Sequence, residues 1–264
     1  MRMRALPIAA VLVLTACGGS TGVGSGSGSP AGSSDRGISG TLTVFAAASL
    51  TDVFTQFGKD LEEQQPGLHV RFNFAGSSAL ATQIAQGAPA DVFASANQAQ
   101  MKVVTDAGLQ AGDPTVFTEN VLEIAVPQGN PGHVTGVRNF GNPDLTLAVC
   151  APAVPCGAAA QQVFALAGVD AKPDTQEDDV KAALTKVQLG EVDAALVYAT
   201  DVRAAGAGVE GISFPEAEQA INQYPICMLE AAPNPAAATA FVDLVLSDPG
   251  QQALADAGFR APTS

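Results

Sequence analysis

Two serines stand where the sequence predicts that a strand gives way to a helix. Ser49 follows the β-branched and aromatic run 41–45, and helical apolar spacing begins at Leu50. Ser77 lies between a predicted strand, 68–74, and a predicted helix, 79–86. At a helix N-terminus a hydroxyl and free backbone N–H groups can both donate to an anion, and the helix dipole favours negative charge. The simpler alternative for either serine is a helix cap, and Ser78 could exchange roles with Ser77.

Both serines follow predicted strands, so both are expected at a carboxyl edge of a sheet, where open α/β sheets bind ligands. No Lys or Arg falls inside either junction, which argues against a carboxylate or phosphate clamp built on arginine. The chemistry indicated is anion recognition by neutral hydrogen-bond donors.

Other chemistries find less support. His69 and His133 are far apart and lack metal-ligand spacing, so we expect no metal site. An exported serine hydrolase using Ser49 or Ser77 is a remote alternative, because there is no G-x-S-x-G elbow. A formal charge of −14 without a basic cluster argues against nucleic-acid binding.

The N-terminus carries an export signal. Arg2 and Arg4 precede an apolar run, 5–14, which is shorter than the about 20 residues that a membrane-spanning helix needs. Leu-Thr-Ala-Cys at 14–17 resembles the lipobox of bacterial lipoproteins, which implies a signal peptide over 1–16 and an acylated Cys17. The alternative is an ordinary signal peptide with a chance cysteine. The Gly/Ser-rich stretch at 17–39 reads as a flexible tether to the outer face of the cell membrane.

Strands alternate with helices over the remaining chain, which predicts an α/β fold with largely parallel sheets. The further predicted strands are 91–94, 121–126, 145–149, 194–198 and 224–229. The further predicted helices are 50–61, 98–107, 158–166, 178–189, 235–246 and 249–257.

An exported protein can keep disulfides. Cys150 and Cys156 bracket a short proline-containing loop and are the favoured pair, which would fix the shape of that loop. Cys227 lies in an apolar run and is expected to be a buried free thiol, although other pairings among the three cysteines remain open.

Several segments in series resemble the periplasmic molybdate-binding proteins of ABC transporters. They are VFAAASLT at 44–51, FAGSSALA at 74–81, GAPADVFASA at 87–96, VPCG at 154–157, EDDV at 177–180, VY at 197–198 and YPI at 224–226. The resemblance implies the two-lobed class II periplasmic binding protein fold, each lobe a mostly parallel sheet flanked by helices. It places chain crossings near Val121 and Tyr224, with one lobe at 40–121 plus 225–264 and the other at 122–224.

The resemblance also implies a ligand set for molybdate. It comprises Ser49, Ser77, the backbone N–H groups of Cys156 and Val180, and the Tyr198 hydroxyl. Cys156 and Val180 lie at predicted helix starts, which agrees with the dipole argument. Val180 would otherwise be a core residue, as would Tyr198.

The same resemblance implies a monomer without cofactor or catalysis, which passes its ligand to an ABC permease. Tungstate is expected to bind as well, because its size and charge are nearly the same. Sulfate stays open as a different anion on the same scaffold.

Overall fold

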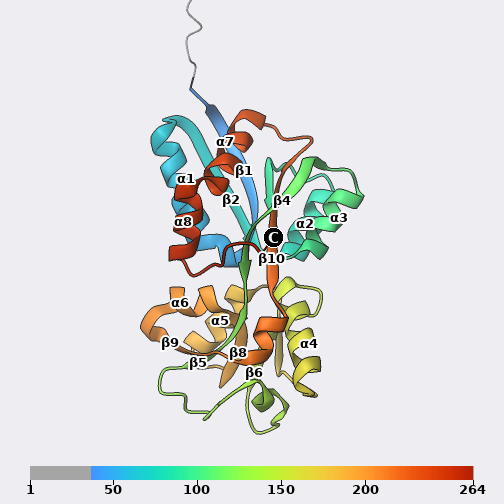
Figure 1. Ribbon diagram of the computed structural model, residues 1–264, viewed down its shortest axis with the longest axis vertical. Coiled ribbons are helices and arrows are strands. Elements are labelled where there is room, and N and C mark those ends of the chain that lie inside the picture. The colour runs from blue at the N-terminus through green and yellow to red at the C-terminus, as the bar shows by residue number, and fades with distance from the viewer. Residues whose placement is uncertain (1–36, 264) are drawn as a thin grey trace, which may run out of the picture. The chain divides into compact units, whose positions relative to one another are not determined.

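The computed structural model describes residues 37–263, which form two five-stranded sheets with helices packed against them (Figure 1). The predicted signal peptide, Cys17 and nearly all of the predicted tether lie outside the described residues. We call the first sheet and its helices the first lobe, and the second sheet and its helices the second lobe.

The first lobe has the strand order β2-β1-β3-β10-β4. Its strands are β1 (Ser39–Ala47), β2 (Gly67–Ala75), β3 (Val92–Ala94), β4 (Gln110–Asn120) and β10 (Asn222–Leu229). Its helices are η1 (Ala48–Leu50), α1 (Thr51–Gln64), α2 (Ser77–Ala85), α3 (Gln98–Asp106), α7 (Pro235–Leu246) and α8 (Asp248–Asp256).

The second lobe has the order β7-β6-β8-β5-β9. Its strands are β5 (Leu122–Pro127), β6 (Leu147–Cys150), β7 (Thr175–Glu177), β8 (Ala194–Tyr198) and β9 (Val209–Ile212). Its helices are α4 (Pro155–Ala167), α5 (Val180–Gln188), α6 (Ala199–Ala205) and the short turns η2 (Val137–Gly141), η3 (Gly206–Gly208) and η4 (Pro215–Gln219).

The predicted α/β class is confirmed, and both sheets are mixed. In the first sheet β1 pairs in parallel with β2 and β3, whereas β10 is antiparallel to both β3 and β4. In the second sheet β6 pairs in parallel with β7 and β8, whereas β5 is antiparallel to β8 and β9. Every antiparallel pair contains β5 or β10, the strands that begin at the two passages between the lobes.

The chain passes between the lobes along two neighbouring segments (Figure 1). The first passage is at Val121, between the end of β4 and the start of β5. The second leads from η4 into β10, whose first residue, Asn222, pairs with Asn120 at the end of β4. Two adjacent connections of this kind are the arrangement that permits a hinge.

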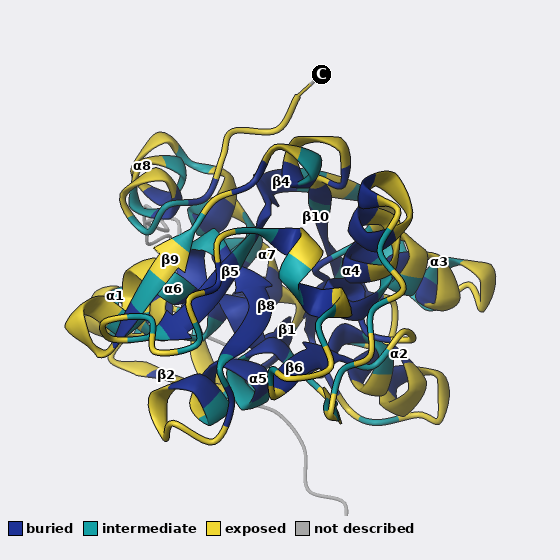
Figure 2. Cartoon of the chain, turned by 90° about the horizontal axis from the view of Figure 1, so that it is seen from below, coloured by how far each residue is buried: buried dark blue, intermediate teal, exposed yellow. Residues whose placement is uncertain are grey.

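Each lobe has its own aromatic contacts within a largely aliphatic core. Apolar residues at helical spacing turn one face of α1 toward β2 and α7, and Phe54 packs edge-on against Phe241 of α7 with ring centroids 5.3 Å apart. In the second lobe Phe140 packs against Phe164 at 5.6 Å. Figure 2 shows β1, β6 and β8 buried at the centre and the outer faces of the helices exposed. Each fully buried Phe of this kind contributes roughly 1.5–3 kcal/mol.

The favoured cysteine pairing is confirmed, since Cys150 and Cys156 form a disulfide that joins the end of β6 to the first turn of α4. Cys227 is a free, buried thiol, and burial raises its pKa to about 12. None of the helices between residues 37 and 263 is long and apolar enough to cross a membrane.

Candidate functional site

Four of the five predicted ligand residues line one narrow cavity, to which both lobes contribute. Its wall from the first lobe is Ala47, Ala48, Ala75, Gly76, Ser77 and Ala96. Its wall from the second lobe is Val154, Pro155, Cys156, Asp179, Val180 and Tyr198. The cavity has a volume of about 10 Å³, which is room for the centre of about one water molecule. The two lobes are therefore close together at this cavity.

Three helices begin at this cavity. The first residue of α2 is Ser77, α4 begins at Pro155, and α5 begins at Val180. The first N–H groups of a helix have no partner within it, so each start offers donors and a positive dipole end. Local sequence fixes two of these starts: Pro155 occupies an N-terminal position of α4, and the Asp179 side chain caps α5 by accepting from Ala182 N–H at 2.9 Å.

Ser77 is fully inside the structure, with 1% of its surface exposed. Its Oγ accepts a hydrogen bond of 3.0 Å from the backbone N–H of Ala96, so the hydroxyl hydrogen stays free to donate to a ligand. The capping alternative is wrong for this residue, because Gly76 holds the N-cap position and Ser77 is the first helical residue. Ser77, and not Ser78, lines the cavity.

Ser49 is not part of the cavity wall. It lies in the 3-10 turn η1, directly after Ala48, and its Oγ lies 2.9 Å from the Tyr224 hydroxyl oxygen. The expected capping of α1 by Ser49 is wrong, because η1 intervenes and Leu50 occupies the N-cap position. Ser49 is thus one residue away from the cavity, and its hydroxyl is engaged with Tyr224.

Tyr198 ends β8 and is 1% exposed. Within residues 37–263 its hydroxyl has no hydrogen-bond partner, although its ring packs edge-on against Tyr224 with centroids 6.0 Å apart. Burial raises the pKa of this phenol well above its ordinary value, with further contributions from Tyr224 and Asp201. The hydroxyl therefore keeps its proton at neutral pH and is a donor that has no partner among the described residues, in the wall of the cavity.

The two lobes approach each other closely at Gly76. A Cβ atom on this residue would overlap the carbonyl oxygen of Asp178, across the cavity from α2. Only glycine lets the backbone before α2 approach the segment before α5 in this way. Sequence reasoning missed Gly76, although its position directly before Ser77 was visible.

Several charged side chains lie near the cavity, but no cationic side chain of the described residues lines it. Among the cavity-lining residues of the described chain no Lys or Arg occurs, and the one carboxylate, Asp179, is occupied as a helix cap. Lys181 adjoins Val180, but its ammonium lies by Asp52 and Asp201. Asp201 is fully buried, and one of its oxygens accepts from Tyr198 N–H at 3.2 Å.

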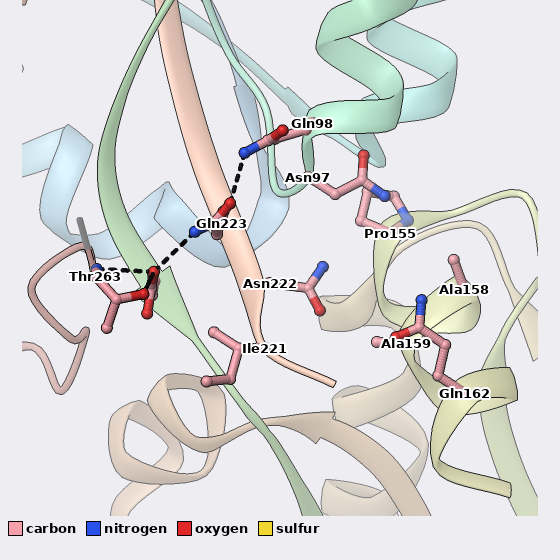
Figure 3. Close-up of a pocket in the computed structure, with 11 residues that line it drawn as sticks. Asn97, Gln98, Pro155, Ala158, Ala159, Gln162, Ile221, Asn222, Gln223 and Thr263 are labelled. Atoms are coloured by element: carbon pink, nitrogen blue, oxygen red, sulfur yellow. Dashed lines mark hydrogen bonds between the residues drawn. The ribbon is translucent and has the colours of Figure 1, made fainter. Parts of the chain in front are cut away.

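A larger pocket of about 270 Å³ shares Pro155 with this cavity and contains none of the five predicted residues (Figure 3). Glu119 in its wall accepts hydrogen bonds from the N–H and hydroxyl of Thr263 and from Gln223. Burial raises the pKa of Glu119, but these hydrogen bonds outweigh it and leave the pKa below its ordinary value. This pocket therefore carries a negative charge and does not suit an anion.

Residues 42–260 match the family model described as bacterial extracellular solute-binding protein. The chain belongs to this family of solute-binding proteins. It is 42% identical to the molybdate-binding protein ModA of Mycobacterium tuberculosis strain H37Rv over 257 residues, which cover 97% of this chain and 96% of that protein.

Solved structures share the fold. The periplasmic molybdate-binding protein of Azotobacter vinelandii superposes with a TM-score of 0.71 at 19% identity, over 84% of this chain and 100% of that one. The sulfate-binding protein SubI of M. tuberculosis superposes with a TM-score of 0.70 at 19% identity, over 84% of this chain and 86% of that one. The fold by itself thus does not choose between these two anions.

The buried Asp201 carboxyl predicts a stability that depends on pH. Burial raises its pKa from 3.8 to about 6; Lys181 and the Tyr198 N–H act in the opposite direction, and Asp52 adds to the rise. The unfolded chain releases this proton near pH 4 and the folded protein only near pH 6, so this group costs stability progressively as pH rises through that window. We expect the free energy of unfolding of wild type, relative to Asp201→Asn, to fall by up to about 3 kcal/mol from pH 4 to pH 7.

Urea unfolding at several pH values measures this difference. Asp144→Asn, at an exposed position of the second lobe, is the matched control and should run parallel to wild type throughout. A difference between wild type and Asp201→Asn that stays constant from pH 4 to pH 7 contradicts the assignment.

Proposed function

We propose that this protein binds molybdate, and also tungstate, in the cavity between its lobes and delivers it to the permease of an ABC importer. The observation that carries the proposal is the meeting of three helix N-termini and the unpartnered Tyr198 hydroxyl at one cavity. The 42% identity to a protein named for molybdate binding supports the choice of anion.

The donor set suits this ligand chemically. Molybdate is a tetrahedral dianion with no proton to donate at neutral pH, so its site should contain donors only. Burying such a charge is costly unless its oxygens are fully hydrogen-bonded. Helix N-termini provide these hydrogen bonds and a favourable dipole without a counter-charge. Hydrogen phosphate would also need an acceptor, and the one carboxylate among the described wall residues, Asp179, uses one of its oxygens to cap α5.

The proposed ligands are the hydroxyls of Ser49, Ser77 and Tyr198 and the backbone N–H groups of Cys156 and Val180. Ser49 would exchange its hydrogen bond with Tyr224 for one with the anion, through a small movement of η1 or of the side chain. The disulfide holds the first turn of α4, and with it the Cys156 N–H, at the end of β6.

Binding proceeds by closure of the lobes about the two chain passages. The proposed limits of the two lobes that move are unchanged: one consists of 40–121 plus 225–264, and the other of 122–224. The protein is further proposed to be an exported monomer, processed after residue 16 and held at the outer face of the membrane by lipid on Cys17.

Sulfate remains the second candidate ligand, because SubI shares the fold. The third candidate, a serine hydrolase, finds no support in the site. Among residues 37–263 the serine hydroxyls contact Tyr224 and the Ala96 N–H, and neither is hydrogen-bonded to a histidine.

Thermal unfolding in the presence of molybdate, tungstate, sulfate and phosphate tests the proposal. A ligand at a thousand times its dissociation constant stabilises the folded state by about 4 kcal/mol. For a chain of this size that raises the unfolding temperature on the order of 10 °C. We expect this shift with molybdate and tungstate and a much smaller one with the other two. A large shift with sulfate alone would transfer the assignment to the second candidate.

Removing the Tyr198 hydroxyl should change ligand affinity and stability in opposite directions. Tyr198→Phe loses one hydrogen bond to the anion, so we expect molybdate affinity to fall about tenfold to a hundredfold. The same variant loses a buried hydroxyl that has no partner in the described chain, so the ligand-free protein should be equally or more stable. Isothermal titration and urea unfolding measure the two effects. Unchanged molybdate affinity would exclude the Tyr198 hydroxyl as a ligand.

A methyl group on Gly76 should oppose closure. Gly76→Ala places a Cβ against the Asp178 carbonyl, so we expect molybdate to bind about tenfold to a hundredfold more weakly. Gly136→Ala is the matched control, because Gly136 also stands at a helix N-cap and has nothing within 4 Å of an added Cβ. Equal affinity in the two variants would mean that the lobes do not approach this closely in the liganded protein.

A further inference from the structure

Lys181 lies between two carboxylates that belong to different lobes. Its Nζ is 2.9 Å from Oδ2 of Asp52, in the first turn of α1, and 3.4 Å from Oδ1 of Asp201, on α6. Asp52 is part of the first lobe, whereas Lys181 and Asp201 are part of the second. None of the three lines the anion cavity. We call them the interlobe charge cluster.

The surroundings of Lys181 differ from those of an ordinary surface lysine. It stands in the first turn of α5, where the helix dipole disfavours a cation. Its side chain is only 29% exposed, and the Asp201 side chain is 0% exposed. Burial lowers the pKa of Lys181, but Asp201 and Asp52 outweigh burial and raise it. By contrast, the Lys102–Asp106 pair lies within α3, and its side chains are 70% and 64% exposed.

The cluster is joined to the proposed ligand groups through the backbone. Lys181 directly follows Val180, which lines the cavity. Asp201 accepts the backbone N–H of Tyr198, the residue that carries the unpartnered hydroxyl. Helix α5 also packs against η1, which leads into α1 and Asp52. The cluster thus lies behind three segments that form the site.

We propose that Asp52 and Lys181 are positioning residues of the anion site, whose ion pair forms when the lobes close. The 2.9 Å contact joins the lobes, so any hinge opening of a few ångströms breaks it. In the closed form the pair holds the start of α5 against the start of α1, and Lys181 neutralises the carboxylate that holds Tyr198. The inference rests on the proposed function, and its effect is slower release of bound molybdate.

Stopped-flow binding of molybdate to the full-length protein tests the inference with two matched variants. Asp52→Asn removes the interlobe pair, and Asp106→Asn removes one equal charge from a pair within a single helix. Because each variant removes one negative charge, any change in long-range repulsion of the anion is common to both. Asp52 is 66% exposed, so its substitution leaves the core intact.

We expect molybdate to dissociate about two- to fivefold faster from Asp52→Asn than from Asp106→Asn, with equal association rates. Raising the ionic strength from about 0.01 M to about 1 M should accelerate dissociation from wild type toward the Asp52→Asn rate, because salt screens a partly exposed pair. Dissociation from Asp52→Asn should respond much less to salt.

Equal dissociation rates for Asp52→Asn and Asp106→Asn would overturn the inference and leave the proposed function standing. A slower association rate confined to Asp52→Asn, with dissociation unchanged, would also overturn it. Failure of wild type to bind molybdate would overturn the proposed function and the inference together.

Discussion

An anion held without a counter-charge needs backbone dipoles from separate parts of the chain aimed at one point. Much of this structure places helix N-termini at one cavity. Parallel strands β1, β2, β6 and β7 each lead into the segment that starts a helix or turn near the cavity, so the starts of α2, α4 and α5 converge there. Pro155 and the Asp179 cap fix where two of these helices begin, and the disulfide ties one of them to its strand. Small residues dominate the wall because only they let backbone N–H groups reach a ligand.

Periodicity in the sequence was sufficient for the α/β class and for many elements, including β8 at Ala194–Tyr198 and α7 at Pro235–Leu246. It missed β4, β7 and β9. Strand β4 contains Gly112, Asp113 and Pro114, which normally indicate a turn, and the other two are only three and four residues long. The antiparallel placement of β10 was also missed, because strand direction depends on the path of the chain through the other lobe and not on local pattern.

Residues that line the cavity were predictable where a single segment of the chain determines their position. Cys156 and Val180 stand at helix starts that the local sequence fixes, Ser77 is the first residue of α2, and Tyr198 ends a strand. The expected placement of Ser49 as the N-cap of α1 was wrong, because the 3-10 turn η1 moves the start of α1 from the predicted Leu50 to Thr51. Contacts between the lobes could not be predicted from the sequence. Lys181 was visible beside Val180, but Asp52 lies 129 residues away and only the folded chain brings them together.

The position of β10 has a consequence for how the molecule is made. This strand fills the gap between β3 and β4, yet it is synthesised after the whole second lobe. A chain that emerges N-terminus first can complete the second sheet from one continuous stretch, whereas the first sheet stays split, with an open edge on β3 and on β4, until the last sixth or so of the chain arrives. Unpaired strand edges are where chains associate wrongly. The molecule therefore relies on prompt release of its C-terminal segment to finish the lobe that began to form first.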